Sequence, residues 1–565
     1  MPIPADKSLP ENYEIEEAAQ RVQVERRHYQ MYPVLTEARL AKIARFGQRM
    51  AFRAGEPLFQ TGERTHGMWV VVNGAVHLVV RNGLGLSQAV REVSAGQFIG
   101  ETATLSGKPY LVDAVAVTDV DAILVPPDQL RALLIAEAQL GSEIMRAFIL
   151  RRVGLIQGQI GPVIVGAPAS PSVLALSDFL RRINHPYRVL DASTDPGVAE
   201  FLKSTDTQPD PEVAVILADG RILRDPGERE LAVALGVVGD VSEQRVYDTV
   251  VVGAGPAGLA SAVYAASEGL SVLVLDCRAF GGQAGASARI ENYFGFPTGI
   301  SGHVLVSRAF EQAVKFGAEI VIQSEVVGLD CQSTPFQIAL KDGRRIKGRT
   351  IVIASGATYR RPDIAGLEKL AGRGVYFWAS SIEGRLCQGQ EVVLVGGGNS
   401  AGQAIVFLAS YAAHVHVMIR RDDLSATMSR YLIDRVSALA NVSIHLRSTI
   451  DALDCDEDGL TQVRVRSPHG TTTIDTRHLF LFTGADPCTH WLQGCGVELN
   501  DKGFVITGRG EEDPETGRRA AFQTTVPGVF AVGDVRATSI KRVASAVGEG
   551  AAVVSEVHAL LSSKT

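Results

Sequence analysis

The chain has 565 residues, of which 46% are hydrophobic and 21% are charged, and its formal net charge is −7. The length allows three or four domains of about 100–200 residues each, and the modest charge argues against a nucleic-acid-binding surface over the whole molecule. Residues 1–27 are polar, without the apolar core of a signal peptide, and no stretch approaches the ~18–20 apolar residues that span a bilayer. The sequence therefore predicts a cytoplasmic protein with no membrane span.

Two regions precede the first glycine-rich motif. In residues 52–125 short β-like runs alternate with glycines, and residues 127–154 follow a helical pattern. We expect residues 1–160 to form a β-rich domain with C-terminal helices. Residues 161–240 alternate strands with one helix, at residues 172–184, which predicts a small α/β domain.

A strand, a glycine-rich turn and a helix begin the third region. Gly253 suits the tight turn, Gly255 lets the backbone approach a pyrophosphate, and Gly258 lets the helix pack against the strand. The helix N-terminus offers free N–H groups to phosphates, and an acid at the end of the second strand can accept from a ribose hydroxyl. The motif predicts a dinucleotide site made by Gly253, Ala254, Gly255, Pro256, Ala257, Gly258 and Asp276.

A second copy of this motif follows the strand at residues 391–395. Ala401 stands in place of the third glycine, which the fingerprint allows. The next strand ends in Arg420 and Arg421 instead of an acid, and paired guanidinium groups can bind a 2′-phosphate. NADPH is therefore favoured over NADH, although one arginine could be only a solvated surface charge. The predicted NADPH residues are Gly396, Gly398, Asn399, Ser400, Ala401, Arg420 and Arg421.

Further motifs follow the first fingerprint in a fixed order: residues 281–283, 291–297, 353–357, 524–534 and 541–544. Together they resemble the flavin-contacting segments of thioredoxin reductases, over residues 246–561. The resemblance implies FAD and NADPH as cofactors, a homodimer, and a nucleotide domain that rotates relative to the FAD domain. It implies Rossmann-like α/β domains for FAD (246–387 and 486–565) and NADPH (388–485). It adds to the FAD site Gly281, Gly282, Gln283, Asn292, Gly356, Gly533, Asp534, Arg542, Val543 and Ala544.

The sequence departs from this family at the redox centre. The family carries Cys-Ala-Thr-Cys before the NADPH fingerprint, whereas this chain has Trp378 and Ser381 at the two cysteine positions. Neither an indole nor a hydroxyl can form a disulfide, so no catalytic residue is assigned. None of the six cysteines forms a Cys-x-x-Cys pair or has zinc-site spacing, and no metal site is expected. Cys387 is expected to be a single buried cysteine, although an approach to the flavin stays open.

Residues 70–74 and 95–101 resemble parts of a cyclic-nucleotide-binding domain with its β-roll. The resemblance implies that Glu101, after Gly100, accepts from a ribose 2′-hydroxyl. The arginine that binds the cyclic phosphate in that family is missing, and Lys108 is the only cation in its place, a point charge and not a fork. The candidate effector site is therefore Gly100, Glu101 and Lys108, with a cyclic nucleotide, another small ligand or no ligand as open alternatives.

The small α/β region resembles a thioredoxin or glutaredoxin fold, but residues 166–172 contain no cysteine. Docking or dimerisation is therefore favoured over a redox role for it. As a whole the sequence predicts a multidomain flavoenzyme that takes hydride from NADPH and passes electrons to an unidentified, non-dithiol acceptor, either a small molecule or a redox protein. Two alternatives stay open: a thioredoxin-disulfide reductase that uses other cysteines, and a ligand or redox sensor gated by the N-terminal domain.

Overall fold

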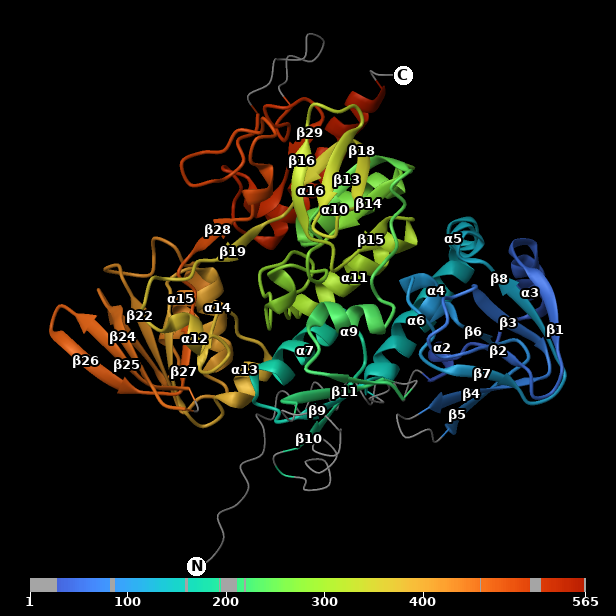
Figure 1. Cartoon of the computed structure of the whole chain (residues 1–565), viewed down its shortest axis with the longest axis horizontal. Coiled ribbons are helices and arrows are strands. Elements are labelled where there is room, and N and C mark those ends of the chain that lie inside the picture. Colours follow the sequence, from blue (N-terminus) through green and yellow to red (C-terminus); the bar gives the residue numbers. More distant parts are fainter. Residues whose placement is uncertain are drawn as a thin grey trace, which may run out of the picture. The chain divides into compact units, whose positions relative to one another are not determined.

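The computed structural model describes residues 28–81, 87–157, 161–192, 194, 211–217, 220–457, 459–508 and 520–562 (Figure 1). The chain divides into two compact units. The first comprises Met1–Pro168 and Ala175–Gly239, and the second comprises Ala169–Leu174 and Asp240–Thr565. None of the helices in these described ranges is both long and apolar enough to cross a membrane.

Two four-stranded antiparallel sheets form the N-terminal part of the first unit, in the orders β1-β8-β3-β6 and β2-β7-β4-β5. β3 pairs with β8 and β6, whereas β4 pairs with β5 and β7, so Gly74, with φ of +87°, carries the chain from one sheet to the other. The strands are β1 (Gln48–Phe52), β2 (Pro57–Phe59), β3 (Met68–Asn73), β4 (Ala75–Arg81), β5 (Ser87–Ser94), β6 (Phe98–Ile99), β7 (Asp113–Ala116) and β8 (Val120–Val125).

Helices surround this β-roll. The predicted C-terminal helical stretch is present as two helices, and the first of them starts with Pro127, whose fixed φ suits the first turn. Its Leu130, Leu133 and Leu134 are buried in the core of the roll, as the helical spacing requires. The helices are α2 (His28–Met31), α3 (Glu37–Ile43), η1 (Ala44–Phe46), α4 (Glu101–Ser106), α5 (Pro127–Ala136) and α6 (Ala138–Gln157).

The small α/β part has a four-stranded sheet in the order β10-β9-β11-β12. The first two strands are parallel and the last two are antiparallel to their neighbours. Gly220, with φ of +85°, lies in the predicted turn between β11 and β12, while Asp219 is outside the described residues. The elements are β9 (Val163–Gly166), α7 (Pro171–Arg182), β10 (Arg188–Asp191), β11 (Val213–Ile216), β12 (Ile222–Arg224) and α9 (Glu228–Ala234).

The part predicted to bind FAD has one mixed sheet, ordered β15-β14-β13-β18-β17-β16, with β29 also pairing with β18. α10 and α16 pack together beside it (Figure 1), so closely that a Cβ on Gly550 would lie 2.2 Å from the carbonyl oxygen of Ala257. Its elements are β13 (Val246–Val252), α10 (Pro256–Ser267), β14 (Val272–Leu275), η2 (Ala284–Ala286), α11 (Gly302–Lys315), β15 (Glu319–Val321), β16 (Val326–Asp330), β17 (Phe336–Leu340), β18 (Arg345–Ile353), η3 (His490–Leu492), β29 (Val529–Ala531), η4 (Gly533–Val535) and α16 (Val543–Ser562).

The part predicted to bind NADPH is inserted into this domain through the strand pair β19 (Ala357–Tyr359) and β28 (Ala485–Pro487). It has a parallel sheet, β20-β27-β21-β22-β23, and an antiparallel sheet, β24-β25-β26. Its other elements are α12 (Leu367–Leu370), β20 (Val375–Tyr376), α13 (Ser381–Leu386), β21 (Glu391–Val395), α14 (Asn399–Leu408), β22 (His414–Ile419), α15 (Arg430–Ser437), β23 (Val442–Leu446), β24 (Thr449–Cys455), β25 (Leu460–Ser467), β26 (Gly470–Asp475) and β27 (His478–Leu481).

Candidate functional site

The first glycine motif has the close approaches that its sequence predicts. Gly253 has φ of +110°, and a Cβ on it would lie 2.3 Å from the carbonyl oxygen of Ala354. A Cβ on Gly258 would lie 1.9 Å from the carbonyl oxygen of Gly253, so only glycine lets α10 pack this closely. A Cβ on Gly282 would lie 3.1 Å from the Cα of Gly255, which brings the second predicted FAD segment against the first.

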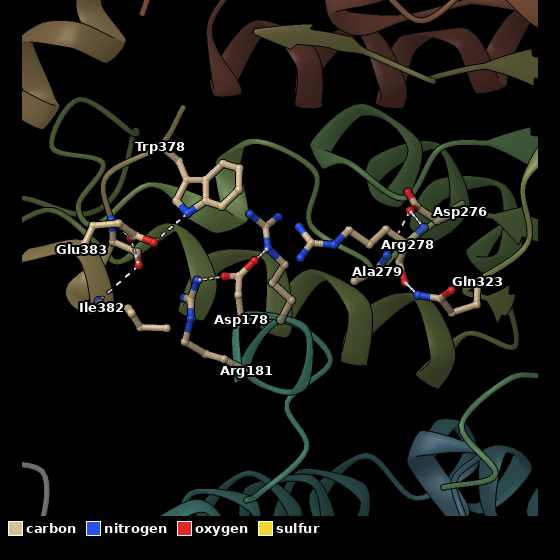
Figure 2. Close-up of polar contacts among 11 residues, drawn as sticks. Asp178, Arg181, Asp276, Arg278, Ala279, Gln323, Trp378, Ile382 and Glu383 are labelled. Carbon is tan, nitrogen blue, oxygen red and sulfur yellow. Dashed lines mark hydrogen bonds and ion pairs between the residues drawn. The ribbon is translucent and has the colours of Figure 1, made fainter. Parts of the chain in front are cut away.

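Asp276 organises the loop at the end of β14. Its Oδ2 accepts from the backbone N–H of Ala254 at 2.8 Å, and its Oδ1 accepts from the N–H groups of Arg278 and Ala279 at 3.0 and 3.1 Å. Figure 2 shows the carboxylate facing the last two of these groups. The acid thus joins the glycine loop to the following turn, and its predicted bond to a ribose hydroxyl stays a prediction.

A partly buried ion pair holds the C-terminal flavin motif. Glu549 of α16 accepts from the backbone N–H of Gly533 at 2.7 Å and from Arg536 Nη2 at 2.7 Å. Burial opposes ionisation of Glu549, but these hydrogen bonds outweigh it and lower its pKa. Burial raises the pKa of Asp534, against the attraction of Lys541, which donates to its backbone carbonyl. Motif spacing did not identify Arg536 or Glu549, because they meet only through the packing of α16.

The second glycine motif is formed in the same way. Gly396 has φ of +146°, and a Cβ on it would lie 2.6 Å from the carbonyl oxygen of Phe482. No atom lies within 4 Å of the place that a Cβ on Gly398 would take, so open space remains before the N-terminus of α14. Asn399 accepts from the N–H of Ser429 through Oδ1 at 2.7 Å, which ties this turn to α15.

The predicted 2′-phosphate residues follow β22, the strand beside this second motif. Arg420 and Arg421 are both exposed and come directly after the strand ends at Ile419. An exposed guanidinium at the carboxyl end of a parallel strand lies where this type of sheet binds nucleotides. Their proposed contact with the 2′-phosphate of NADPH agrees with this position and stays a prediction.

A hydrogen-bond network occupies the segment where the family carries its dithiol. The Trp378 indole N–H donates to Glu383 Oε1 at 2.9 Å (Figure 2). The backbone N–H and hydroxyl of Ser380 donate to Glu383 Oε2 at 2.9 and 2.5 Å. Glu383 is 5% exposed, and Ser380 and Glu383 form a capping box that starts α13. Sequence reasoning missed Glu383, although Ser-x-x-Glu before a helix is the signature of this cap.

The cysteines fall into different environments. Cys387 is fully buried, its thiol donates to the carbonyl of Gly384 at 3.3 Å, and burial raises its pKa to about 12. The prediction of a single buried cysteine at this position is confirmed. Cys331 and Cys495, which lie far apart in sequence, pack in one apolar core, which the spacing of the cysteines did not predict. In the described parts of the chain no cluster of side chains is suited to hold a metal ion.

The candidate effector residues have different partners in the structure. Gly100, with φ of +81°, precedes α4, and Glu101 behind it is 1% exposed and paired with Arg151 Nη1 at 2.9 Å. Arg151, from α6, also donates to the carbonyl of Phe98 at 2.8 Å. The cassette glutamate thus has a partner inside the protein, which the helical pattern of α6 could not reveal.

The side chain of Lys108 reaches from the β-roll to the small α/β part. Its Nζ donates to the carbonyl of Ile183 at 2.5 Å. It lines a cavity of about 460 Å³ whose walls also carry Arg221, His185 and Glu63. A cavity of this size is in the range of small-molecule sites.

Sequence comparison agrees with this architecture. The family described as "Pyridine nucleotide-disulphide oxidoreductase" matches residues 247–550, and "Cyclic nucleotide-binding domain" matches residues 49–137. The first match covers more than half of the chain, which therefore belongs to the pyridine nucleotide-disulphide oxidoreductase family. The fold is that of a thioredoxin reductase, with two Rossmann-like domains, preceded by a cyclic-nucleotide-binding domain.

Individual relatives match the C-terminal part. The thioredoxin reductase of Listeria monocytogenes is 33% identical over 314 residues, which cover 55% of this chain and 92% of the relative. NADPH-dependent thioredoxin reductase 3 of Arabidopsis thaliana is 32% identical over 313 residues, 54% of this chain and 56% of the relative. The crystal structure of T. acidophilum thioredoxin reductase has a TM-score of 0.51 at 27% identity and covers 57% of this chain and 100% of its own.

These findings make the protein an NAD(P)H-dependent flavoprotein oxidoreductase with FAD and NADPH as cofactors. The glycine cradles fit these groups, since Gly255 and Gly282 bring two backbone segments together without side chains between them and Gly398 faces open space. FAD, when bound, accepts hydride from the nicotinamide, and the protein supplies positioning and electrostatics for that chemistry.

Proposed function

We propose that this enzyme passes the reducing equivalents of NADPH, by way of FAD, to an acceptor that is not served by a dithiol in the NADPH domain. The observation that carries this proposal is the network of Trp378, Ser380 and Glu383. An indole replaces the first thiol of the family, and a buried carboxylate fixes that indole and caps the next helix. Because only thiolates exchange disulfides, this segment favours an acceptor of another chemistry, either a small molecule such as a quinone or a redox protein.

The experiment is anaerobic reduction of the FAD-loaded protein by NADPH, followed by mixing with oxidised thioredoxin or, separately, with a quinone. Reoxidation of the flavin by the quinone, without catalytic reoxidation by thioredoxin, is the expected result. Thioredoxin reoxidation at a catalytic rate would overturn the proposal and would favour a disulfide reductase that uses other cysteines. A thioredoxin reductase that retains its Cys-x-x-Cys, assayed with the same thioredoxin preparation, is the positive control.

We also propose that the N-terminal domain senses a small-molecule effector. The cavity beside Lys108 supports this, because it combines two cationic side chains, Lys108 and Arg221, with an apolar wall that includes Leu111 and Leu217. Titration of the holoenzyme with cyclic AMP and cyclic GMP, followed by flavin fluorescence, tests the proposal. A saturable response in the wild type that Lys108→Ala weakens and Arg224→Ala preserves would support it, since Arg224 is exposed and absent from the cavity wall. Absence of a response to both nucleotides would exclude cyclic-nucleotide gating.

We propose a cytoplasmic homodimer, in line with the thioredoxin-reductase resemblance, in which the small α/β part serves docking or dimerisation. Its redox role is disfavoured because residues 166–172 carry no thiol. Sedimentation of the holoenzyme tests the dimer, and removal of residues 161–240 tests which part holds the two copies together.

A further inference from the structure

The cavity beside Lys108 lies between two parts of the first unit. Residues 61–63 and 108–111 of the β-roll line one side of it, and residues 161–162, 185, 217, 221 and 233–237 of the small α/β part line the other. Gly236, with φ of +65°, lets these parts approach, since a Cβ on it would lie 2.8 Å from Pro109 Cγ. Lys108 joins them as well, through its hydrogen bond to the carbonyl of Ile183. A ligand in this cavity would therefore contact both parts of the unit.

The charges of the cavity wall favour an anion. The described residues that line it include two cations, Lys108 and Arg221, and one carboxylate, that of Glu63. This carboxylate accepts from the backbone N–H of Gln60 at 2.9 Å, which holds it in the turn of its own loop. Two cations against one carboxylate leave one positive charge, and a proton on His185, which also lines the cavity, would only add to it. A carboxylate or another singly charged oxyanion matches this balance.

Much of the remaining wall is aliphatic. One leucine comes from the roll, and the other aliphatic side chains come from the ends of β11 and α9: Leu111, Leu217, Val233, Leu235 and Val237. Burial of apolar ligand surface against these side chains is favourable, whereas they offer no hydrogen bonds to a purine base. At about 460 Å³ the cavity has room for an anionic head group together with an apolar chain or ring.

The cassette of the roll, by contrast, is occupied by side chains of the protein itself. Glu101 is paired with Arg151 at 2.9 Å. The ring of Tyr110, which is 2% exposed, lies against Gly100, where a Cβ would be 3.3 Å from Tyr110 Cε1. A ligand at the cassette would have to displace these groups, whereas a ligand beside Lys108 would enter a cavity that is already formed. The ligand of this domain is therefore expected between the roll and the small α/β part.

We propose that this cavity binds an amphipathic organic anion, with a carboxylate head group on Lys108 and Arg221 and an apolar body against Leu111, Leu217 and Val233. The inference rests on the effector role proposed above for the N-terminal domain, and it names the class of ligand that this role would use. Because the ligand contacts the roll and the small α/β part together, its binding stabilises the folded first unit as a whole.

The test uses the full-length FAD-loaded enzyme and octanoate as the probe, followed by isothermal titration calorimetry at pH 7. We expect saturable binding of one octanoate per chain. Octanamide, which has the same chain without the charge, should bind roughly 10–100-fold more weakly, and octylamine, with the opposite charge, should not bind. Equal affinity for octanoate and octanamide, or no saturable binding of octanoate, would overturn the proposal.

Four variants locate the bound octanoate. Lys108→Ala and Arg221→Ala should each weaken its binding roughly 10–100-fold, because each removes a cation of the wall. Val233→Trp should abolish binding by filling the cavity, and it should fold normally because Val233 is 59% exposed. Arg224→Ala, the control, should keep the wild-type affinity, because Arg224 is exposed and absent from the wall. Unchanged binding in Arg221→Ala and Val233→Trp would place octanoate elsewhere and overturn the proposal.

The ligand class and the effector role can fail separately. Octanoate binding that is lost in Arg221→Ala but leaves flavin fluorescence unchanged would support the binding site and count against the effector role. Binding of cyclic AMP that is lost in Arg221→Ala, without any binding of octanoate, would preserve the effector role and overturn the amphipathic anion as its ligand.

Discussion

Replacement of Glu383 by alanine should loosen the segment that takes the place of the family's dithiol. The change removes a buried carboxylate that accepts three hydrogen bonds, from the Trp378 indole and from the backbone and hydroxyl of Ser380. The N-cap itself stays, because the hydroxyl of Ser380 still accepts from the backbone N–H of Ile382. Each of the three donors left without an acceptor costs roughly 1 kcal/mol, the lower end of the usual range, because the opened segment admits water. The free energy of opening this segment should therefore fall by about 3 kcal/mol.

Hydrogen–deuterium exchange followed by mass spectrometry measures this change locally. Since about 1.4 kcal/mol corresponds to a tenfold change in an equilibrium constant, amides in residues 378–387 should exchange about a hundredfold faster in Glu383→Ala. The exchange rate in Glu383→Gln should lie between those of the wild type and of Glu383→Ala. The amide oxygen of this glutamine can accept from Trp378, but its NH₂ group cannot accept from Ser380. Glu368→Ala, which removes an exposed carboxylate of α12, is the matched control. Equal exchange in Glu383→Ala and Glu368→Ala would refute the reasoning.

Three further changes test other parts of the molecule. Burial, followed by the charge of its neighbour, lowers the pKa of His478 from 6.5 to about 4. Neutral His478 therefore contributes about 3 kcal/mol to the free energy of unfolding above pH 6.5, and this contribution is lost as the pH falls towards 4. The urea midpoint of His478→Gln should lack this part of the pH dependence. Joint replacement of Arg420 and Arg421 by alanine should raise KM for NADPH about 10–100-fold and leave KM for NADH nearly unchanged; equal loss with both nucleotides in steady-state assays would contradict the assignment. Arg151→Ala should destabilise the first unit by about 3–5 kcal/mol, because it leaves a carboxylate buried without its partner, whereas exposed Arg146→Ala on the same helix should unfold at the wild-type urea concentration.

The glycine motifs could be predicted from sequence because their physics is local. A turn with positive φ at Gly253, and a helix packed on a strand at Gly258, need the same residue types at the same spacing in any Rossmann-like unit. The predicted strands on both sides of each motif are present for the same reason. The composition of these few residues therefore determines where a nucleotide can approach the backbone.

Long-range partners could not be predicted in this way. Glu549 holds Gly533 only because α16 packs beside the flavin motif, and Arg151 reaches Glu101 only because α6 lies against the roll. Each partner looks in sequence like an ordinary charged residue of a helix. The resemblance to a cyclic-nucleotide-binding domain did not suggest the ion pair of Glu101 and Arg151, since it assigns Glu101 to a ligand.

The network around Glu383 also makes this segment unfavourable for a reactive thiol. A thiol placed at Trp378 would lie beside a buried carboxylate, and a nearby negative charge raises the pKa of a thiol and disfavours the reactive thiolate. The same carboxylate would lose its indole donor while it still capped α13 through Ser380. Disulfide chemistry at this position therefore conflicts with the local structure that replaced it. The conflict favours transfer of electrons from the flavin to an acceptor that binds the protein directly, without a protein thiol as intermediate.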